Sequence, residues 1–107
     1  MSKNTTAILA EVAAERERQD SKWGEQNHPD GTGGAHQRIA AAKAKRYCDA
    51  YFEQGVGDWR LILTEEVAEA FAESDPARLR GELIQVAAVA VSWAEAIDRR
   101  LAAKEES

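Results

Sequence analysis

The sequence predicts an all-α protein, most simply a four-helix bundle, and three observations support this fold class. The chain contains only 2 prolines and many alanines, a composition that favours helix. No stretch alternates apolar and polar residues for long enough to indicate a strand. Four segments separated by glycine, proline and Asn/Asp turn formers remain as helix candidates. The 107 residues suffice for one small domain, 1–107, whose ends, 1–5 and 105–107, are expected to fray.

The first half of the chain is expected to hold two helices joined by a long loop. The first helix covers about Thr6 to Asp20, and the loop runs from Ser21 to Gly34. Four glycines and a proline rule out a regular element in the loop, and long loops in compact folds are often functional. The second helix fits His36 to Gln54 and is ended by Gly55 and Gly57.

The second half is expected to hold two further helices with clear start signals. Asp58 is a plausible N-cap for a third helix from about Trp59 to Glu73. Asp75 can cap the fourth, and Pro76 suits its first position because a proline there loses no hydrogen bond. This last helix runs to about Lys104, which is long for so small a domain.

The middle of the last helix predicts a homo-oligomer. In "LIQVAAVAVSWA", Leu83 to Ala94, only Gln85 and Ser92 are polar. A helix that is apolar on all sides must be covered on all sides, and three shorter helices can hardly do so. A second copy of the chain is the economical cover, so we expect a two-fold dimer or a higher oligomer.

Composition and charge exclude several classes of function. The net charge of −5 argues against binding a DNA or RNA polymer, which needs a basic surface, but not against a single nucleotide held through a divalent cation. The single cysteine, Cys48, excludes an intrachain disulfide, and Glu11 interrupts any signal-peptide core. The longest apolar run, Val86 to Val91, is too short to span a membrane. A cytoplasmic protein is expected.

The segment "LTEEVAEAFAES" places an acidic face beside the apolar stripe of the third helix. Glu66, Glu69 and Glu73 fall within about 60° of one another, with Glu65 at the edge of the arc. Like charges at these spacings destabilise a helix by about 0.2–0.5 kcal/mol per pair, and no lysine intervenes. A divalent cation would offset the repulsion, and oxygen ligands suit Mg²⁺, with Mn²⁺ as the alternative. Acids on a solvated surface are the competing interpretation.

A second acid lies where charge is least expected, at the entrance to the apolar run. Glu82 and Gln85 are three residues apart and therefore share a face. If the fourth helix runs antiparallel to the third, Glu82 lies opposite Glu66 and Glu69. We expect these three carboxylates to meet.

This spacing resembles a known family. The chain contains the pattern Glu66-x-x-Glu69, then twelve residues, then Glu82-x-x-Gln85. This pattern resembles the E-x-x-E…E-x-x-D signature of the MazG-like all-α nucleoside triphosphate pyrophosphohydrolases. The flanking segments "ILTEEVAEA" and "LRGELIQVAAVAVSW" also resemble sequences of that family. The likeness covers Trp59 to Arg100 and, more loosely, "ERERQDSKWGEQNHP". It implies Mg²⁺-dependent cleavage of a nucleoside triphosphate to monophosphate and pyrophosphate, in nucleotide-pool housekeeping. It also implies that Glu66, Glu69 and Glu82 are catalytic metal ligands.

One position departs from the family pattern, because Gln85 replaces the last acid. A glutamine offers a carbonyl oxygen as a metal ligand but no charge. This change could weaken the metal site, unless Glu65 or Glu73 compensates, or mark a catalytically silent nucleotide- or partner-binding bundle. A purely structural helical oligomer with solvated acids is the third hypothesis.

Candidate substrate-binding residues come from the loop and from basic positions. Trp23 could stack on a nucleobase while Asn27 or His28 reads its edge, in keeping with the base pocket that the family resemblance implies. The structural alternative is that Trp23 plugs the end of the bundle and His28 caps a turn. Lys43 and Arg46 share a helix face and are candidates for phosphate, although a solvated basic face is the commoner arrangement.

Arg80 is a further candidate, because it lies two residues before Glu82. It could neutralise the leaving pyrophosphate or pair with a neighbouring acid. Other chemistries find no support in the sequence. There is no G-x-x-x-x-G-K-[ST] phosphate loop. Cys48 has no histidine at helical spacing, and His28 and His36 form no Glu-x-x-His pair of the di-iron type.

Overall fold

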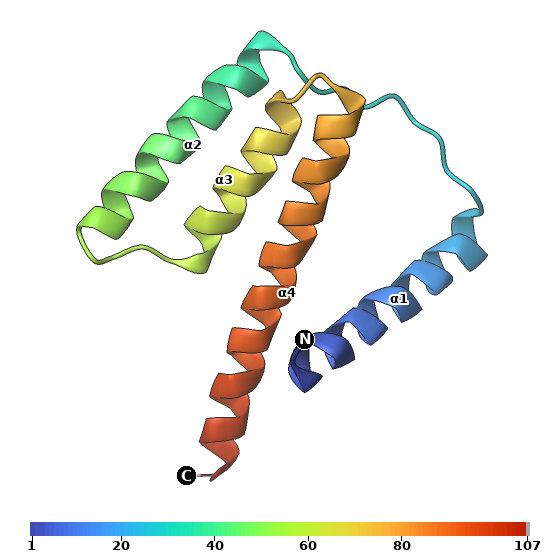
Figure 1. Ribbon diagram of the computed structural model, residues 1–107, viewed down its shortest axis with the longest axis vertical. Helices are drawn as coiled ribbons and strands as arrows, with labels where there is room; N and C mark the ends of the chain where they lie inside the picture. The colour runs from blue at the N-terminus through green and yellow to red at the C-terminus, as the bar shows by residue number, and fades with distance from the viewer. Residues whose placement is uncertain (107) are drawn as a thin grey trace. The chain divides into compact units, whose positions relative to one another are not determined.

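The computed structural model describes residues 1–106 and is all-α, as predicted. Figure 1 shows the four helices in chain order: α1 Lys3–Trp23, α2 Ala35–Glu53, α3 Trp59–Ala72 and α4 Pro76–Glu106. Among residues 1–106 there is no strand, and no helix is long and apolar enough to cross a membrane. Residue 107, part of the expected frayed end, lies outside the described residues.

Local capping chemistry explains where the helices begin and end. The Asp58 carboxylate accepts from the backbone N–H of Leu61 at 2.9 Å, and the Asp75 carboxylate accepts from that of Arg78 at 2.9 Å. Both predicted N-caps are therefore confirmed, and such caps typically contribute about 1 kcal/mol each. The prediction for α1, Thr6 to Asp20, was too short at both ends. The helix begins at Lys3 after the N-cap Ser2, and it continues to Trp23 and ends at Gly24, whose φ is 68°.

The chain divides into two compact units. The first combines Met1–Pro29 with the part of α4 that starts at Val91. In this unit the hydroxyls of Ser2 and Thr5, at the start of α1, donate hydrogen bonds to the Glu95 carboxylate on α4. Ile8 and Val91 are its buried apolar residues.

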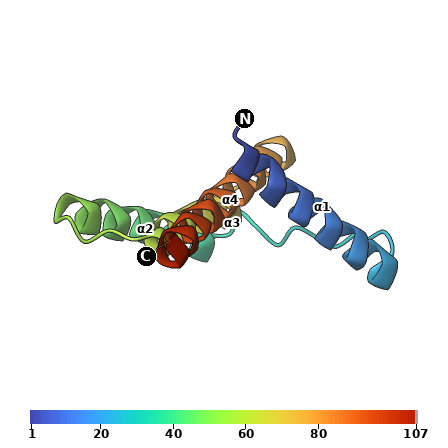
Figure 2. The ribbon, with the colours of Figure 1, turned by 90° about the horizontal axis from the view of Figure 1, so that it is seen from below.

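The second unit, Asp30–Ala90, contains α2, α3 and the first part of α4. Helices α2 and α3 lie side by side and antiparallel, as Figure 1 shows. Figure 2 shows the same helices from below. The buried residues of the unit come from all three helices: Cys48, Leu61, Ala70 and Leu79. Two of the four, Cys48 and Ala70, have small side chains.

The end of the long loop is bonded to the C-terminus of α3. The Gly33 N–H donates to the carbonyl of Phe71 at 2.9 Å, and the Thr32 hydroxyl donates to the carbonyl of Glu73 at 2.6 Å. These bonds satisfy carbonyls that have no partner within the helix. Gly33 has a φ of 83°, and a Cβ at this position would lie 2.6 Å from the Cβ of Ser74.

We predict that Gly33→Ala destabilises the protein more than Gly31→Ala. Both glycines have positive φ, where an alanine costs about 1–2 kcal/mol. Only at Gly33 does the new methyl group also collide with Ser74, whereas a Cβ at Gly31 meets nothing within 4 Å. Urea unfolding of both variants measures the difference. Equal losses of unfolding free energy would show that the loop is not held against α3 in solution.

Candidate metal centre

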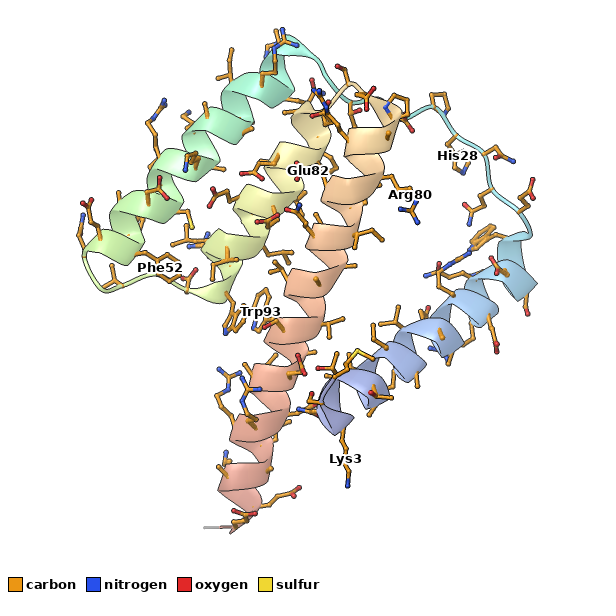
Figure 3. The ribbon with its side chains drawn as sticks, viewed as in Figure 1. Lys3, His28, Phe52, Arg80, Glu82 and Trp93 are labelled. Carbon is orange, nitrogen blue, oxygen red and sulfur yellow. The ribbon has the colours of Figure 1, made fainter. Side chains whose placement is uncertain are left out.

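Three carboxylates from two helices converge in the second unit. Glu66 and Glu69 lie one turn apart on α3, and Glu82 lies on α4. One oxygen of each carboxylate lies within 4.8 Å of the corresponding oxygens of the other two. Figure 3 shows Glu82 on the side of α4 that faces α3. We call these three residues the acid triad.

The acid triad is partly removed from water. All three side chains are half-buried, and the Oε2 atoms of Glu66 and Glu82 are buried without a hydrogen-bond partner among the described residues. A buried acceptor left unpartnered typically costs about 1–3 kcal/mol. Burial without a partner is therefore unfavourable at two oxygen atoms of the triad.

Burial and mutual repulsion both act on the protonation of the triad. Desolvation raises the pKa of Glu66 above its usual 4.5, and the charges of Glu82 and Glu65 raise it further. Desolvation also raises the pKa of Glu69, helped by Glu66, Glu65 and Glu82. A proton or a cation would relieve this repulsion, because either one reduces the negative charge.

The donor set fits a hard divalent cation. Mg²⁺ binds oxygen ligands at about 2.0–2.1 Å in an octahedron, so ligands on opposite sides are about 4.2 Å apart. The three oxygens lie within 4.8 Å of one another, so the side chains would have to draw closer together to share one ion. Carboxyls that share protons would also satisfy the same arrangement, and clustered acids are common on protein surfaces without any ion.

Glu65 on α3 and Glu73 just beyond it interact with groups outside the triad. Burial, followed by interaction with Glu65, raises the pKa of the Cys48 thiol on α2 to about 11. A Glu73 carboxylate oxygen accepts from the backbone N–H of Asp75 at 3.0 Å. Gln85, one turn beyond Glu82 on α4, is exposed. Cys48 is thus a buried, protonated thiol at the α2–α3 contact.

A lysine that the sequence analysis did not select, Lys45, affects the pKa of one acid of the triad. Lys45 on α2 forms an ion pair with Asp49 at 3.3 Å, and its positive charge lowers the pKa of Glu69. Lys43 and Arg46, the basic residues singled out from the sequence, are exposed on the same helix. Which of these three basic residues acts on the acids depends on how α2 is rotated about its axis relative to α3, and no local sequence signal specifies that rotation.

The remaining predicted residues lie on α4 and in the first unit. Arg80 points to the side of α4 opposite Glu82, as Figure 3 shows. Trp23, Asn27 and His28 belong to the first unit. Their recorded contacts are local: the Lys22 ammonium lies 4.9 Å from the Trp23 ring centre, Asn27 donates to Glu25 at 3.1 Å, and His28 lies 3.2 Å from the Gln26 amide oxygen. Their role at a base remains a prediction.

Comparison with known proteins returns no relative. No family model, no curated protein and no solved structure matches the chain. The geometry of the triad and the spacing of its residues are therefore the observations on which a functional proposal rests.

We predict that metal-free stability depends on pH through the triad. The pKa values of Glu66 and Glu69 are higher in the folded protein than the value of 4.5 expected for the unfolded chain. Protonation of these carboxyls therefore stabilises the fold below pH 4.5, and this stabilisation is lost as pH rises through their pKa values in the folded protein. Glu66→Gln removes one of the repelling charges, so it should increase the free energy of unfolding near pH 7 by about 1 kcal/mol. The advantage should shrink as pH approaches 4.5.

Chemical denaturation in the presence of a chelator, at several pH values, measures this difference. Glu53→Gln on α2 is the matched control, because it removes the same charge from an exposed position. A Glu66→Gln variant that is no more stable than the control at pH 7 would show that the triad is solvated and unstrained.

Proposed function

We propose that the protein is a Mg²⁺-dependent nucleoside triphosphate pyrophosphohydrolase of the MazG-like kind. The proposed reaction cleaves between the α and β phosphates and yields a nucleoside monophosphate and pyrophosphate. The observation that carries the proposal is the convergence of Glu66, Glu69 and Glu82 from two helices, with ligand oxygens within 4.8 Å of one another. The E-x-x-E…E-x-x-Q spacing of the same residues supplies the reaction class.

The triad would hold the ion through one oxygen from each carboxylate. A bound Mg²⁺ neutralises phosphate charge and lowers the pKa of a bound water. Hydrolysis of a phosphoanhydride depends on positioning and electrostatics more than on a covalent nucleophile, which agrees with a protonated, buried Cys48. The unpartnered Oε2 atoms of Glu66 and Glu82 would gain a partner when the ion binds.

The proposed substrate is a canonical or modified deoxynucleoside triphosphate, and the proposed role is control of the nucleotide pool. Trp23, Asn27 and His28 are the candidates for binding the base on the sequence argument alone. Lys43, Arg46 and Arg80 remain candidates for the phosphates on the sequence argument alone. A net charge of −5 supports a small nucleotide rather than a nucleic-acid polymer as the ligand.

The second candidate function is binding of a nucleotide or a partner without turnover. Gln85 favours it, because an exposed amide supplies no charge where the family signature has an acid. Three carboxylates still suffice to hold one divalent ion. The two functions differ only in turnover, so an activity assay separates them.

We predict Mg²⁺-dependent release of pyrophosphate from at least one nucleotide in a panel of ribo- and deoxynucleoside triphosphates. Glu66→Ala should reduce kcat/KM by at least about 100-fold, because it removes a ligand from the ion. Gln85→Asp should raise activity by restoring a fourth charge. Glu53→Gln, an exposed acid on α2, is the control with unchanged activity.

The outcomes separate the hypotheses. An active native chain whose Glu66→Ala variant is inactive supports the enzyme. An inactive native chain that gains turnover with Gln85→Asp supports the silent binding bundle. Absence of both metal and nucleotide binding would leave only a structural helical protein.

We also propose that a second copy of the chain covers the exposed apolar surface of α4. Leu83 and Ile84 are 50% and 57% exposed, and Ala87 and Ala88 beside them are also exposed. A Cβ at Gly81 would meet nothing within 4 Å, so another helix can approach closely here. Adjacent exposed apolar residues of this kind favour self-association.

We predict that Ile84→Glu shifts the protein toward the monomer. Sedimentation equilibrium at several concentrations measures the association constant, and Arg78→Glu, exposed on another face of α4, is a control for charge on this helix. The buried charge should weaken association by at least about tenfold. A native protein that is monomeric at all concentrations would overturn the proposal.

A further inference from the structure

We propose that a groove between α2 and α3 binds a small planar aromatic anion, at a site separate from the acid triad. The groove lies within the second unit and has a volume of about 220 Å³. Its lining residues are Ala44, Tyr47 and Tyr51 from α2 and Arg60, Leu61 and Thr64 from α3. The inference does not depend on the proposed function.

The groove and the acid triad lie on different sides of α3. Arg60 and Thr64 are one turn apart and share a side of the helix. At 100° per residue, Glu66 and Glu69 are turned from Thr64 by about 200° and about 140° around the helix axis. A ligand in the groove therefore contacts residues that the proposed metal centre does not use.

The α2 side of the groove favours a flat ring. Tyr47 and Tyr51 are one turn apart, so their side chains are neighbours on α2. They are 54% and 45% exposed, and Leu61 adds a buried apolar side chain from α3. Aromatic side chains bind other rings through offset-stacked or edge-to-face contacts. A volume below the roughly 300–1,000 Å³ of sites for drug-sized ligands limits the ligand to one ring or a fused pair.

The charge of the groove favours an anion. Among the six lining residues, Arg60 carries the only charge. Its Nη2 atom lies 3.8 Å from one carboxylate oxygen of Asp58, which is beyond hydrogen-bond distance. The other Asp58 oxygen accepts from the backbone N–H of Leu61 at 2.9 Å. The Arg60 side chain is 72% exposed, so its donors can meet a carboxylate in the two-bond geometry that arginine favours.

A second cation lies beyond the other end of the groove. Lys43 is exposed and lies one turn before Tyr47, on the same side of α2. Because α2 and α3 are antiparallel, the start of α3 with Arg60 lies toward Tyr51, whereas Lys43 lies beyond Tyr47. Positive charge at both ends favours an anionic ligand and disfavours a cationic one.

The probe is 2-naphthoate, and neutral 2-naphthamide is its matched control. Titration followed by ¹H–¹⁵N spectra measures affinity and location together. We expect naphthoate to shift the amide signals of Tyr47, Leu61 and Thr64. Arg60→Gln should weaken naphthoate binding about fivefold and leave naphthamide binding unchanged, because only the carboxylate pairs with the guanidinium.

Two further variants separate the ring contact from net charge. Tyr47→Leu should weaken both probes about fivefold, because it removes a ring from a half-exposed position and keeps an apolar side chain there. Arg100→Gln, exposed on α4 in the first unit, removes the same charge elsewhere and should match the native protein.

Four results would overturn the inference. The first is the absence of shifts at the groove amides, and the second is a shift of the Leu83 and Ile84 amides in their place. The third is equal binding of naphthoate by the native protein and Arg60→Gln, or equal weakening in Arg60→Gln and Arg100→Gln. The fourth is a change of the groove amides with protein concentration alone, which would show that a second copy covers the groove. None of these results bears on the proposed reaction at the acid triad.

Discussion

The enforced proximity of like charges between α3 and α4 is the constraint on which the rest of the second unit depends. Helix packing brings Glu82 to Glu66 and Glu69, and two carboxylate oxygens are buried there without a hydrogen-bond partner among the described residues. The packing must therefore offset a repulsion that the same packing creates. Unfavourable local electrostatics of this kind concentrate at functional sites, because a ligand can relieve them.

The offsetting interactions are numerous and individually small. Each helix of the second unit contributes one or two buried residues, and Asp58 and Asp75 cap the two helices that carry the triad. The loop end adds two hydrogen bonds from Thr32 and Gly33 to the last carbonyls of α3. With caps at its start and loop contacts at its end, α3 presents Glu66 and Glu69 from a helix that is fixed at both termini.

The role of α2 emerges only from its contact with α3. Cys48 is a buried thiol on α2, and its raised pKa keeps it protonated. Lys45, on the same helix, forms an exposed ion pair with Asp49, and its charge lowers the pKa of Glu69 on α3. Helix α2 therefore contributes positive charge to the electrostatics of the acids.

The sequence by itself determined the four helices, two of their N-caps and the shared face of Glu66 and Glu69, because capping and helical periodicity act within a few residues. It also indicated Glu82 as their partner, since an acid before an apolar run is conspicuous. Only the tertiary structure decided that the charge of Lys45 acts on Glu69, that Arg80 points away from Glu82, and that the loop end is bonded to the C-terminus of α3. Such choices depend on the rotation of each helix about its axis, which is set by contacts between residues far apart in the chain.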